Sequence, residues 1–290
     1  MKRLFVFGMG YTAQEVGRQV RADGWRVAGT CRSAETAEAL DRQGFEMFLF
    51  DGRQPMESAA RALAGTTHLL ASVPPDDSGD PVLRAHAGDI ASLPGLAWAG
   101  YLSTTGIYGD RDGAWVDEST PRSPTTPRGR RRAEAEMAWM GLRELGMVPV
   151  HLFRLPGIYG PGRSAIDAVR AGRTRRIFKP GQVFSRIHVD DLAAALIASM
   201  VQPRPGAVYN LCDDEPAPPQ DVTAYACELL GLPVEPLTPL EEADLSPMAR
   251  SFYEDSKRVS NERMKRELGV RLAYPTYREG LRAILARQGS

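Results

Sequence analysis

The sequence predicts an α/β fold, a doubly wound parallel sheet, from three observations. Short apolar runs alternate with longer amphipathic ones through the first 155 residues. The short runs are apolar on both faces, as strands buried between two layers of helices are. The longer runs carry helical spacing, and strands that alternate with helices form parallel sheets with right-handed crossovers.

Six apolar runs are the expected strands of this sheet: Leu4–Phe7, Arg26–Thr30, Met47–Phe50, His68–Ser72, Trp98–Ser103 and Val148–Arg154. The clearest early helices are predicted at Thr12–Asp23 and Ala34–Arg42. The longest connection runs from Gly106 to about Thr126, and loops of this length are usually functional or disordered. It follows the fifth strand, at the sheet edge where α/β proteins bind their ligands.

After this loop a helix is expected from about Thr126 to Leu145. Residues at helical spacing predict its buried face: Ala135, Ala138, Trp139, Leu142 and Leu145. A turn is expected next at Gly157–Gly162, followed by helices at Ser164–Ala171 and Asp191–Val201, the second with Asp190 as a possible N-cap. A strand at Val208–Leu211 and a helix near Gln220–Leu230 follow, before two or three terminal helices. We expect a sheet domain over residues 1–155, rejoined by 185–212, and a smaller lobe formed by 156–184 and 213–290.

The amino-acid composition limits the classes of function to be considered. Lys plus Arg and Asp plus Glu number 36 each, so charge gives no support for a nucleic-acid or membrane-surface partner. No apolar run approaches the roughly 18 residues of a membrane helix. The three cysteines and four histidines show no metal-ligand spacing, so no metal is expected, and an odd cysteine count without a framework suits a reducing cytoplasm.

The first turn carries a dinucleotide-binding fingerprint. Gly8-Met9-Gly10-Tyr11-Thr12-Ala13 matches G-x-G-x-x-G/A, directly after a strand and at the start of a helix. Gly8 allows the tight turn, Gly10 lets the backbone approach a pyrophosphate, and Ala13 lets the helix pack on the strand. Tyr11 and Thr12 open the helix, whose N-terminus offers N–H donors to phosphates. The alternative is a structural glycine turn without a ligand.

The end of the second strand bears on the choice between NAD and NADP. NAD sites usually carry an acid there for the ribose 2′-hydroxyl, but this chain has none and reads Cys31-Arg32-Ser33. Arg32 can pair with a 2′-phosphate, which favours NADP over NAD, or it is a solvated surface arginine. Asp51 can accept from the adenine amino group or serve as a turn residue, and Ser72 is a further cofactor-binding candidate.

Together with three later segments, this fingerprint resembles the extended short-chain dehydrogenase/reductase family, which includes nucleotide-sugar epimerases and dehydratases. The segments are Ser103–Gly109 (STTGIYG), Arg154–Gly162 (RLPGIYGPG) and Ile187–Ala193 (IHVDDLA). The resemblance runs from residue 3 to about residue 230. It implies an NAD(P)-binding Rossmann fold with a C-terminal substrate lobe.

The resemblance also implies a catalytic group, from which this chain departs. Family members use a Ser or Thr on the fifth strand, which corresponds to Thr104, and a Tyr-x-x-x-Lys pair at the start of the next helix. The segment Pro127–Glu134 falls where the family reads Pro-Tyr-Gly-x-x-Lys, so Arg128 replaces the tyrosine and Arg132 the lysine. Arg132 can still donate to a ribose. Arg128 cannot shuttle protons, because a guanidinium is not deprotonated in proteins.

Another group must therefore be the acid/base of an active enzyme. Tyr108 is the first candidate, and its alternative is a packing tyrosine in the pocket wall. The remaining candidates are Asp110, Asp112, Glu118, Tyr11 and Tyr159. The arginine-rich start of the helix has an alternative as a solvated face, with Arg132 and Glu136 at i, i+4 spacing.

The substrate is a small molecule that the sequence does not name. Nucleotide-sugar enzymes of the family carry a diphosphate-binding arginine where this chain has Phe184, although Arg163 and Arg186 remain for an anionic ligand. The resemblance implies that Pro156 shapes the wall beside the nicotinamide, and His188 is expected to be structural. Three functions stay open: an NADP(H)-dependent oxidoreductase or epimerase, a catalytically inactive sensor, and an RNA-binding offshoot. A homodimer is a further option.

Overall fold

The computed structural model describes residues 1–288, which form two compact units. The first, the sheet unit, comprises Met1–Thr104, Arg130–Arg154 and Ala193–Tyr209. The second unit comprises Thr105–Gly129, Leu155–Leu192 and the chain from Asn210 onward. Each unit is therefore assembled from three separate stretches of sequence.

A seven-stranded sheet is the centre of the sheet unit. Its strands are β1 (Arg3–Phe7), β2 (Arg26–Cys31), β3 (Glu46–Leu49), β4 (His68–Ala71), β5 (Trp98–Thr104), β7 (Val150–Leu155) and β11 (Val208–Asn210). Their order is β11-β7-β5-β4-β1-β2-β3, and β1 pairs in parallel with both β2 and β4. After β1, the chain thus adds β2 and β3 on one side of β1, and from β4 onward it adds the remaining strands on the other side. This change of direction is a topological switch point, where open α/β sheets bind ligands beyond the carboxyl ends of the strands.

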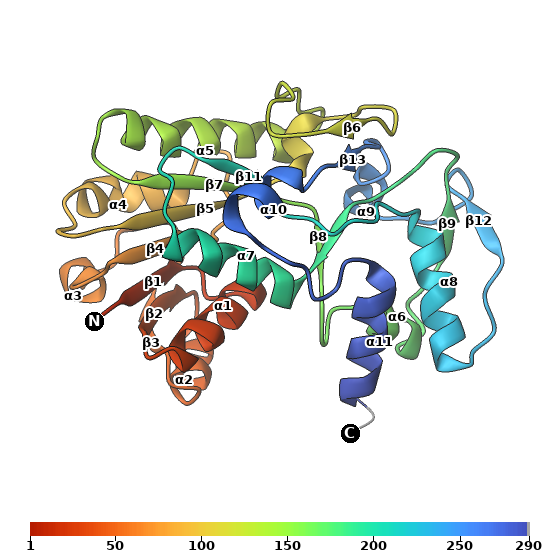
Figure 1. Cartoon of the computed structure of the whole chain (residues 1–290), viewed down its shortest axis with the longest axis horizontal. Coiled ribbons are helices and arrows are strands. Elements are labelled where there is room, and N and C mark those ends of the chain that lie inside the picture. The colour runs from red at the N-terminus through yellow and green to blue at the C-terminus, as the bar shows by residue number, and fades with distance from the viewer. Residues whose placement is uncertain (289–290) are drawn as a thin grey trace. The chain divides into compact units, whose positions relative to one another are not determined.

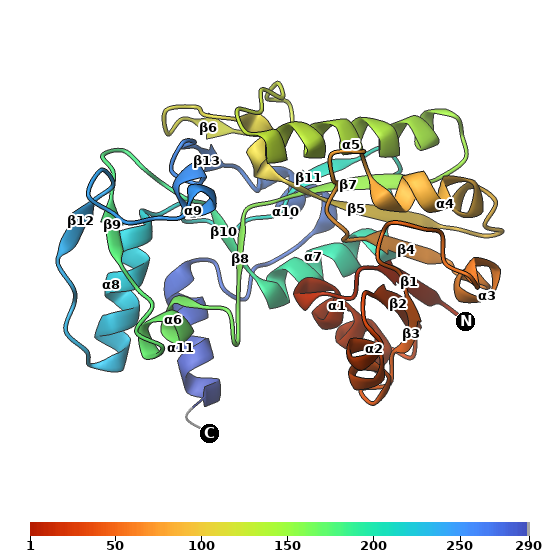
Figure 2. The same cartoon turned by 180° about the vertical axis from the view of Figure 1, so that it is seen from behind.

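Helices cover both faces of the sheet (Figures 1 and 2). They are α1 (Tyr11–Ala22), α2 (Ala34–Asp41), α3 (Ala59–Leu63), α4 (Pro81–Ala91), α5 (Pro127–Glu144) and α7 (Val189–Val201). Both views place α4 and α5 on one face and α1, α2 and α7 on the other. Residues of α3, α4 and α5 share one apolar cluster with the strands, in which Trp139 and Tyr101 are fully buried. The fold class predicted from the sequence is confirmed, and the predicted strand bounds differ by at most two residues.

The second unit contains short strands and helices. They are a 3₁₀ turn (Thr105–Tyr108), β6 (Trp115–Val116), β8 (Gly157–Tyr159), α6 (Ala165–Arg170), β9 (Arg176–Phe178), β10 (Arg186–His188), α8 (Pro219–Leu230), β12 (Leu237–Pro239), α9 (Pro247–Ser251), β13 (Arg258–Val259), α10 (Glu262–Leu268) and α11 (Tyr277–Gln288). The strands form three parallel pairs, β8–β10, β9–β12 and β6–β13. Helices α6, α8 and α11 share an apolar core.

Three local predictions were wrong in whole or in part. The segment Gly157–Gly162 begins with β8, because it pairs with the distant β10, and the predicted turn is confined to Pro161 and Gly162. Ala138 and Leu145 are exposed, whereas the charged Glu136 is fully buried on the sheet-facing side of α5. Asp190 is not an N-cap, since α7 already begins at Val189.

Within residues 1–288, no helix combines the length and apolarity needed to cross a lipid bilayer. The same residues contain no group of three His, Cys, Asp or Glu side chains placed to hold a metal ion. The three cysteines are buried and unpaired.

Candidate functional site

The glycine turn after β1 is fixed by the strand beside it. The Gly8 N–H donates to Thr30 Oγ1 at 2.9 Å, and the Met9 N–H donates to the Thr30 carbonyl at 2.8 Å. Gly8 has a φ of +87°, and a Cβ there would lie 3.1 Å from Val73 Cγ2. A side chain at Gly8 would therefore strain the turn and crowd the segment after β4, at the switch point.

The structural reason for a glycine at position 10 differs from the reason for Gly8. Its backbone is extended, with φ −86° and ψ −168°, which any residue adopts. A Cβ at Gly10 would have only the Gly8 carbonyl oxygen near it, at 4.0 Å. Nothing in the packing of the sheet unit requires a glycine here. The open space in front of Gly10 is what a close backbone approach to a ligand needs.

Helix α1 begins at this open space with an N-terminus suited to an anion. Gly10 is its N-cap, no side chain caps it, and its first turn holds no acidic residue. Thr12 and Ala13 are buried, and Tyr11 is half-buried. The positive end of the helix dipole and the amide donors of the first turn thus lie beside the glycine turn, which is the arrangement that binds phosphate.

The other predicted cofactor residues lie at the carboxyl ends of neighbouring strands. The Ser72 N–H donates to the Phe7 carbonyl at 2.9 Å, directly beside the glycine turn. Asp51 is half-exposed and accepts the Arg53 N–H at 2.8 Å, so it forms the turn after β3. Arg32 follows β2, is exposed, and has no hydrogen bond or ion pair with any described residue. The residues come together at one edge of the sheet, and Arg32 is available there for an anion.

Arg132 contacts the fifth strand rather than its own helix. Its guanidinium donates to the Leu102 carbonyl and lies 5.7 Å from the Tyr101 ring centre. The expected i, i+4 pair with Glu136 does not form, because Glu136 is bound by Arg154: Nε lies 3.2 Å from Oε1, and Nη2 lies 3.0 Å from Oε2. This buried ion pair between α5 and β7 was missed, because a glutamate among charged residues gives no sequence signal of burial.

Tyr108 is completely buried in the second unit. Its hydroxyl donates to Asn210 Oδ1 at 2.8 Å, and Asn210 Nδ2 donates to the Ser260 carbonyl at 3.3 Å. Glu118 accepts the Asn210 N–H at 2.7 Å, and burial raises the pKa of Glu118. The cluster connects two of the three stretches of the unit, Thr105–Gly129 and the stretch from Asn210 onward. Its geometry favours the packing interpretation of Tyr108, and Thr104 at the end of β5 is half-buried.

The remaining candidate catalytic-site residues lie in different surroundings. Arg128 is exposed at the start of α5, 5.8 Å from the ring centre of Phe252. Burial raises the pKa of Asp110, but hydrogen bonds from the Ser256 and Asp112 N–H groups outweigh it and hold that pKa below its usual value. Asp112 is exposed with a φ of 48°. Burial raises the pKa of Tyr159, whose hydroxyl donates to the Thr276 carbonyl at 3.4 Å.

Most of the predicted substrate-side residues make contacts with other parts of the protein that stabilise the fold. Arg186 is 9% exposed and donates to the Ala217 carbonyl at 3.1 Å, which leaves Arg163 as the exposed arginine of the two. His188 is buried against Tyr274, and burial lowers its pKa to about 4, so the ring is neutral near pH 7. Pro156 is half-buried at the end of β7, and Phe184 contacts the Tyr253 ring edge-on.

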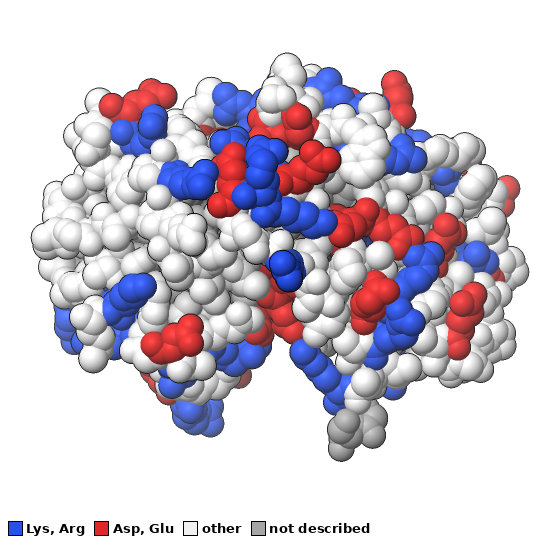
Figure 3. Space-filling model, viewed as in Figure 1, with Lys and Arg blue, Asp and Glu red and all other residues white. Residues whose placement is uncertain are grey.

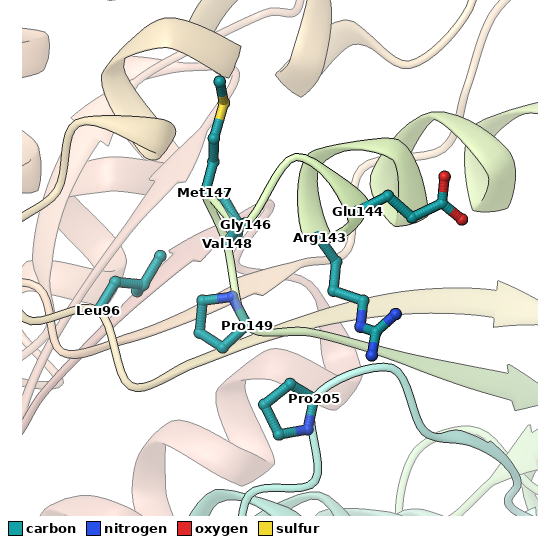
Figure 4. Close-up of a pocket in the computed structure, with 8 residues that line it drawn as sticks. All are labelled: Leu96, Arg143, Glu144, Gly146, Met147, Val148, Pro149 and Pro205. Carbon is teal, nitrogen blue, oxygen red and sulfur yellow. The ribbon is translucent and has the colours of Figure 1, made fainter.

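A hollow of about 530 Å³ lies elsewhere on the sheet unit (Figure 4). Leu96, Val148 and Pro149 line it, just before β5 and β7 begin, with the Arg143 side chain extending toward Pro205. This is the amino-terminal edge of the sheet, opposite the glycine turn. On the face drawn in Figure 3, acidic and basic side chains are interspersed, without a field of one sign.

The glycine turn, the uncapped helix and the switch point define a Rossmann-type α/β protein. No protein-family model matches the chain. A solved structure of a conserved protein of unknown function from Silicibacter pomeroyi DSS is 54% identical, covers 99% of both chains and superposes with a TM-score of 0.91. The chain belongs to one family with that protein.

More distant proteins match 95% or more of the chain. Protein YeeZ of Escherichia coli (strain K12) is 28% identical over 288 residues, 95% of this chain and 97% of YeeZ. A structure from Methylobacillus flagellatus, provisionally assigned as an NAD-dependent epimerase/dehydratase, is 27% identical, covers 100% and 99% of the two chains and has a TM-score of 0.73. A dTDP-glucose 4,6-dehydratase from Bacillus anthracis, solved in complex with NAD, is 16% identical with a TM-score of 0.77, covers 100% and 97% of the two chains and shares the fold. The chain therefore has the fold of the epimerase/dehydratase proteins that its motifs resemble.

Proposed function

We propose that this protein binds a nicotinamide dinucleotide, NADP(H) in preference to NAD(H). We further propose that it acts as an oxidoreductase or epimerase on a small substrate with a carbonyl or hydroxyl group. The observation that carries the proposal is Gly10, a glycine that the packing of the protein does not require, beside an uncapped helix N-terminus. A bound nicotinamide would supply or accept a hydride.

The residues present fit such a cofactor. The first-turn amides of α1 would hold the pyrophosphate, with Gly10 allowing its approach. Ser72 lies beside the same turn. The NAD-bound dehydratase of the same fold supports a nicotinamide dinucleotide as the ligand class.

Arg32 supports NADP(H). It is exposed, unpaired within the described chain, and stands where NAD sites usually carry an acid. A planar guanidinium binds a phosphate through two hydrogen bonds, and it offers no acceptor to a ribose 2′-hydroxyl.

Calorimetric titration of the purified protein with NADPH tests the central proposal. We expect NADPH to bind, and Gly10→Ala to weaken that binding at least tenfold while the thermal unfolding midpoint stays unchanged. The matched control is Gly88→Ala, on α4, where a Cβ meets nothing within 4 Å. Equal NADPH affinity in Gly10→Ala and Gly88→Ala would contradict the assignment of the glycine turn.

Arg32→Ala tests the choice of cofactor. We expect it to weaken NADPH binding by about 1.5–3 kcal/mol, the usual range for a hydrogen bond to a charged group, and to leave NADH binding nearly unchanged. Arg42→Ala is the control, because Arg42 is an exposed arginine at the other end of α2. The same loss for both cofactors would refute the 2′-phosphate role.

A second function, a cofactor-binding sensor without catalysis, is favoured by the surroundings of Tyr108 and by the chemistry of Arg128. Tyr108 is fully buried with its hydroxyl engaged by Asn210, and Arg128 cannot release a proton. Substrate-dependent oxidation of NADPH on a panel of aldehydes and ketones separates the two functions. Tight NADPH binding without turnover on that panel would favour the sensor.

A further inference from the structure

Arg84, on α4, joins two loops at the carboxyl edge of the sheet. Its guanidinium pairs with Asp76 through two hydrogen bonds, from Nη1 to Oδ1 at 3.0 Å and from Nη2 to Oδ2 at 2.9 Å. Nη2 also donates to the Gly52 carbonyl at 2.9 Å. Asp76 lies in the loop after β4 and Gly52 in the loop after β3, so these three residues form an arginine brace between the loops. A bidentate pair fixes the direction of the guanidinium as well as its distance.

Local structure fixes both loop ends of the arginine brace. In the loop after β4, the Ser78 N–H donates to Asp76 Oδ1 at 2.8 Å, which closes a turn around the carboxylate. In the loop after β3, Gly52 has a φ of +86°, and a Cβ there would lie 3.1 Å from Pro81 Cβ. Gly52 thus lies against the first residue of α4, the helix that carries the arginine.

The start of α4 gives Arg84 a rigid base. Asp80 caps this helix, and its Oδ1 accepts the N–H groups of Val82 at 2.9 Å and Leu83 at 3.0 Å. Its Oδ2 accepts Trp139 Nε1–H at 3.2 Å, and both Asp80 and Trp139 are buried. The arginine brace is therefore built on a capped helix that is tied to the core of the sheet unit.

Both loops contact the candidate cofactor site within the sheet unit. A Cβ at Gly8 would lie 3.1 Å from Val73 Cγ2 and 3.3 Å from Val73 N, so the loop after β4 begins against the glycine turn. The Phe50 N–H donates to the Cys31 carbonyl at 2.9 Å, which places the start of the loop after β3 beside Arg32. The arginine brace thus connects the loop that touches the glycine turn with the loop that begins beside Arg32.

The charge of Arg84 is neutralised by its partner. Hydrogen bonds from Arg84 hold the pKa of Asp76 below its usual value, so this carboxylate is ionised at neutral pH. A guanidinium in a bidentate pair offers a phosphate little net charge, in contrast to the exposed Arg32. Arg84 therefore acts on a ligand through the geometry of the two loops.

We propose that Arg84 is a positioning residue for the adenosine half of the bound dinucleotide. This inference rests on the proposed function. With the pyrophosphate at the glycine turn and the 2′-phosphate at Arg32, the adenosine lies at the carboxyl edge, among the loops after β2, β3 and β4. In this role Arg84 does not contact the cofactor. It holds two of these loops at a fixed separation before the ligand arrives, so binding does not bear the entropy cost of ordering them.

The first test separates a brace from a charge effect. The probe is adenosine 2′,5′-bisphosphate, which carries the adenosine half alone, titrated calorimetrically into the purified chain. We expect Asp76→Ala to weaken its binding about tenfold, because loops without the brace must be ordered on binding. Electrostatics alone predicts the opposite, since the change removes an acid near an anionic ligand. Binding as tight as in wild type, or tighter, would overturn the proposal.

Asp77→Ala is the matched control for this change. Asp77 is the next residue of the same loop, its side chain is 93% exposed, and its Oδ1 lies 3.4 Å from Arg131 Nη1, outside the arginine brace. We expect Asp77→Ala to bind the bisphosphate at least as tightly as wild type. A loss equal to that of Asp76→Ala would assign the effect to the loop in general and overturn the role of the brace.

Arg84→Met shows whether the two side chains act together. We expect it to weaken bisphosphate binding as much as Asp76→Ala does, and the double variant to bind no more weakly than either single variant, because each single change already breaks the brace. Additive losses would show that Arg84 and Asp76 act independently, against the proposal. The thermal unfolding midpoint of each variant checks that the fold is retained.

Hydrogen exchange tests the brace without a ligand. Arg84→Met should speed exchange of the Arg53 amide in the loop after β3 and of the Ser78 amide in the loop after β4, since both are protected by bonds that close these turns. Arg42→Ala, which removes an exposed arginine of α2, is the control and should change neither. Unchanged exchange in Arg84→Met would overturn the brace. Failure of wild type to bind NADPH would reject the proposed function, whereas NADPH and bisphosphate binding unaffected by Asp76→Ala would reject only the role of Arg84.

Discussion

At the scale of single residues, Asp213 is the least expected feature of the chain. It follows a cysteine and precedes another acidic residue, in a polar stretch of sequence that is typical of an exposed turn. In the structure, however, Asp213 is 1% exposed, and its Oδ2 has no hydrogen-bond partner among the described residues. Burial raises the pKa of Asp213 to about 8, and the nearby Arg186 acts in the opposite direction. The carboxyl is therefore protonated in the folded protein at neutral pH and ionised in the unfolded chain.

This difference predicts a pH dependence of stability. Between pH 4 and pH 8 the folded state binds a proton at Asp213 that the unfolded state does not. The contribution of Asp213 to stability is thus complete below pH 4 and is lost as the pH rises to about 8, with a slope of up to about 1.4 kcal/mol per pH unit. Urea unfolding of Asp213→Asn at several pH values should show a flatter profile than wild type over this range. Parallel profiles would show that Asp213 does not titrate this way.

At the scale of elements, α5 shows which features the sequence determines locally. The helix lies where the pattern predicts it, but its buried face contains Glu136 in place of Ala138. Hydrophobic periodicity assigns a charged residue to solvent, and only the tertiary position of Arg154 on β7 makes burial of Glu136 tolerable. The glycine turn was predictable because its sequence fingerprint lies within one strand-turn-helix segment, although Thr30 of the neighbouring strand fixes the turn in the folded chain.

A double-mutant cycle measures this ion pair. Glu136→Met or Arg154→Met alone should destabilise the protein by about 3–5 kcal/mol, because each leaves a buried charge without its partner. The double variant should lose less than the sum of the two, as judged by denaturant unfolding. Arg282→Ala, which breaks an exposed pair with Glu279, is the control and should cost less than about 1 kcal/mol. Additive losses would show that the pair does not act as a unit.

Sequence analysis did not predict the elements that depend on pairing between residues far apart in the sequence. Strand β8 pairs Ile158 with Ile187, and glycine and proline around Ile158 suggested a turn. The contact between Tyr108 and Asn210 likewise joins residues 102 positions apart, so the motif around Tyr108 could not decide between a catalytic and a packing role. The hydrogen bond from Thr125 to Asp255 joins residues 130 positions apart and is likewise recognisable only in the folded chain.

At the scale of the whole molecule, the proposed cofactor should stabilise the native state. A ligand that binds only the folded protein adds about 2.7 kcal/mol at a hundred times its Kd. NADPH at that concentration should raise the thermal unfolding midpoint of wild type and of Gly88→Ala more than that of Gly10→Ala, in which a tenfold weaker affinity leaves about 1.4 kcal/mol of stabilisation. The measurement is a melting curve with and without NADPH, and an equal rise in all three proteins would show that the ligand binds away from the glycine turn.

The division of the chain into two units limits how genetic recombination can exchange them. The polypeptide passes between the units at residues 104–105, 129–130, 154–155, 192–193 and 209–210. A single crossover at any one of these points divides at least one of the two units, so it cannot separate them as two intact pieces. No single crossover can therefore exchange one unit as an intact module without dividing the other.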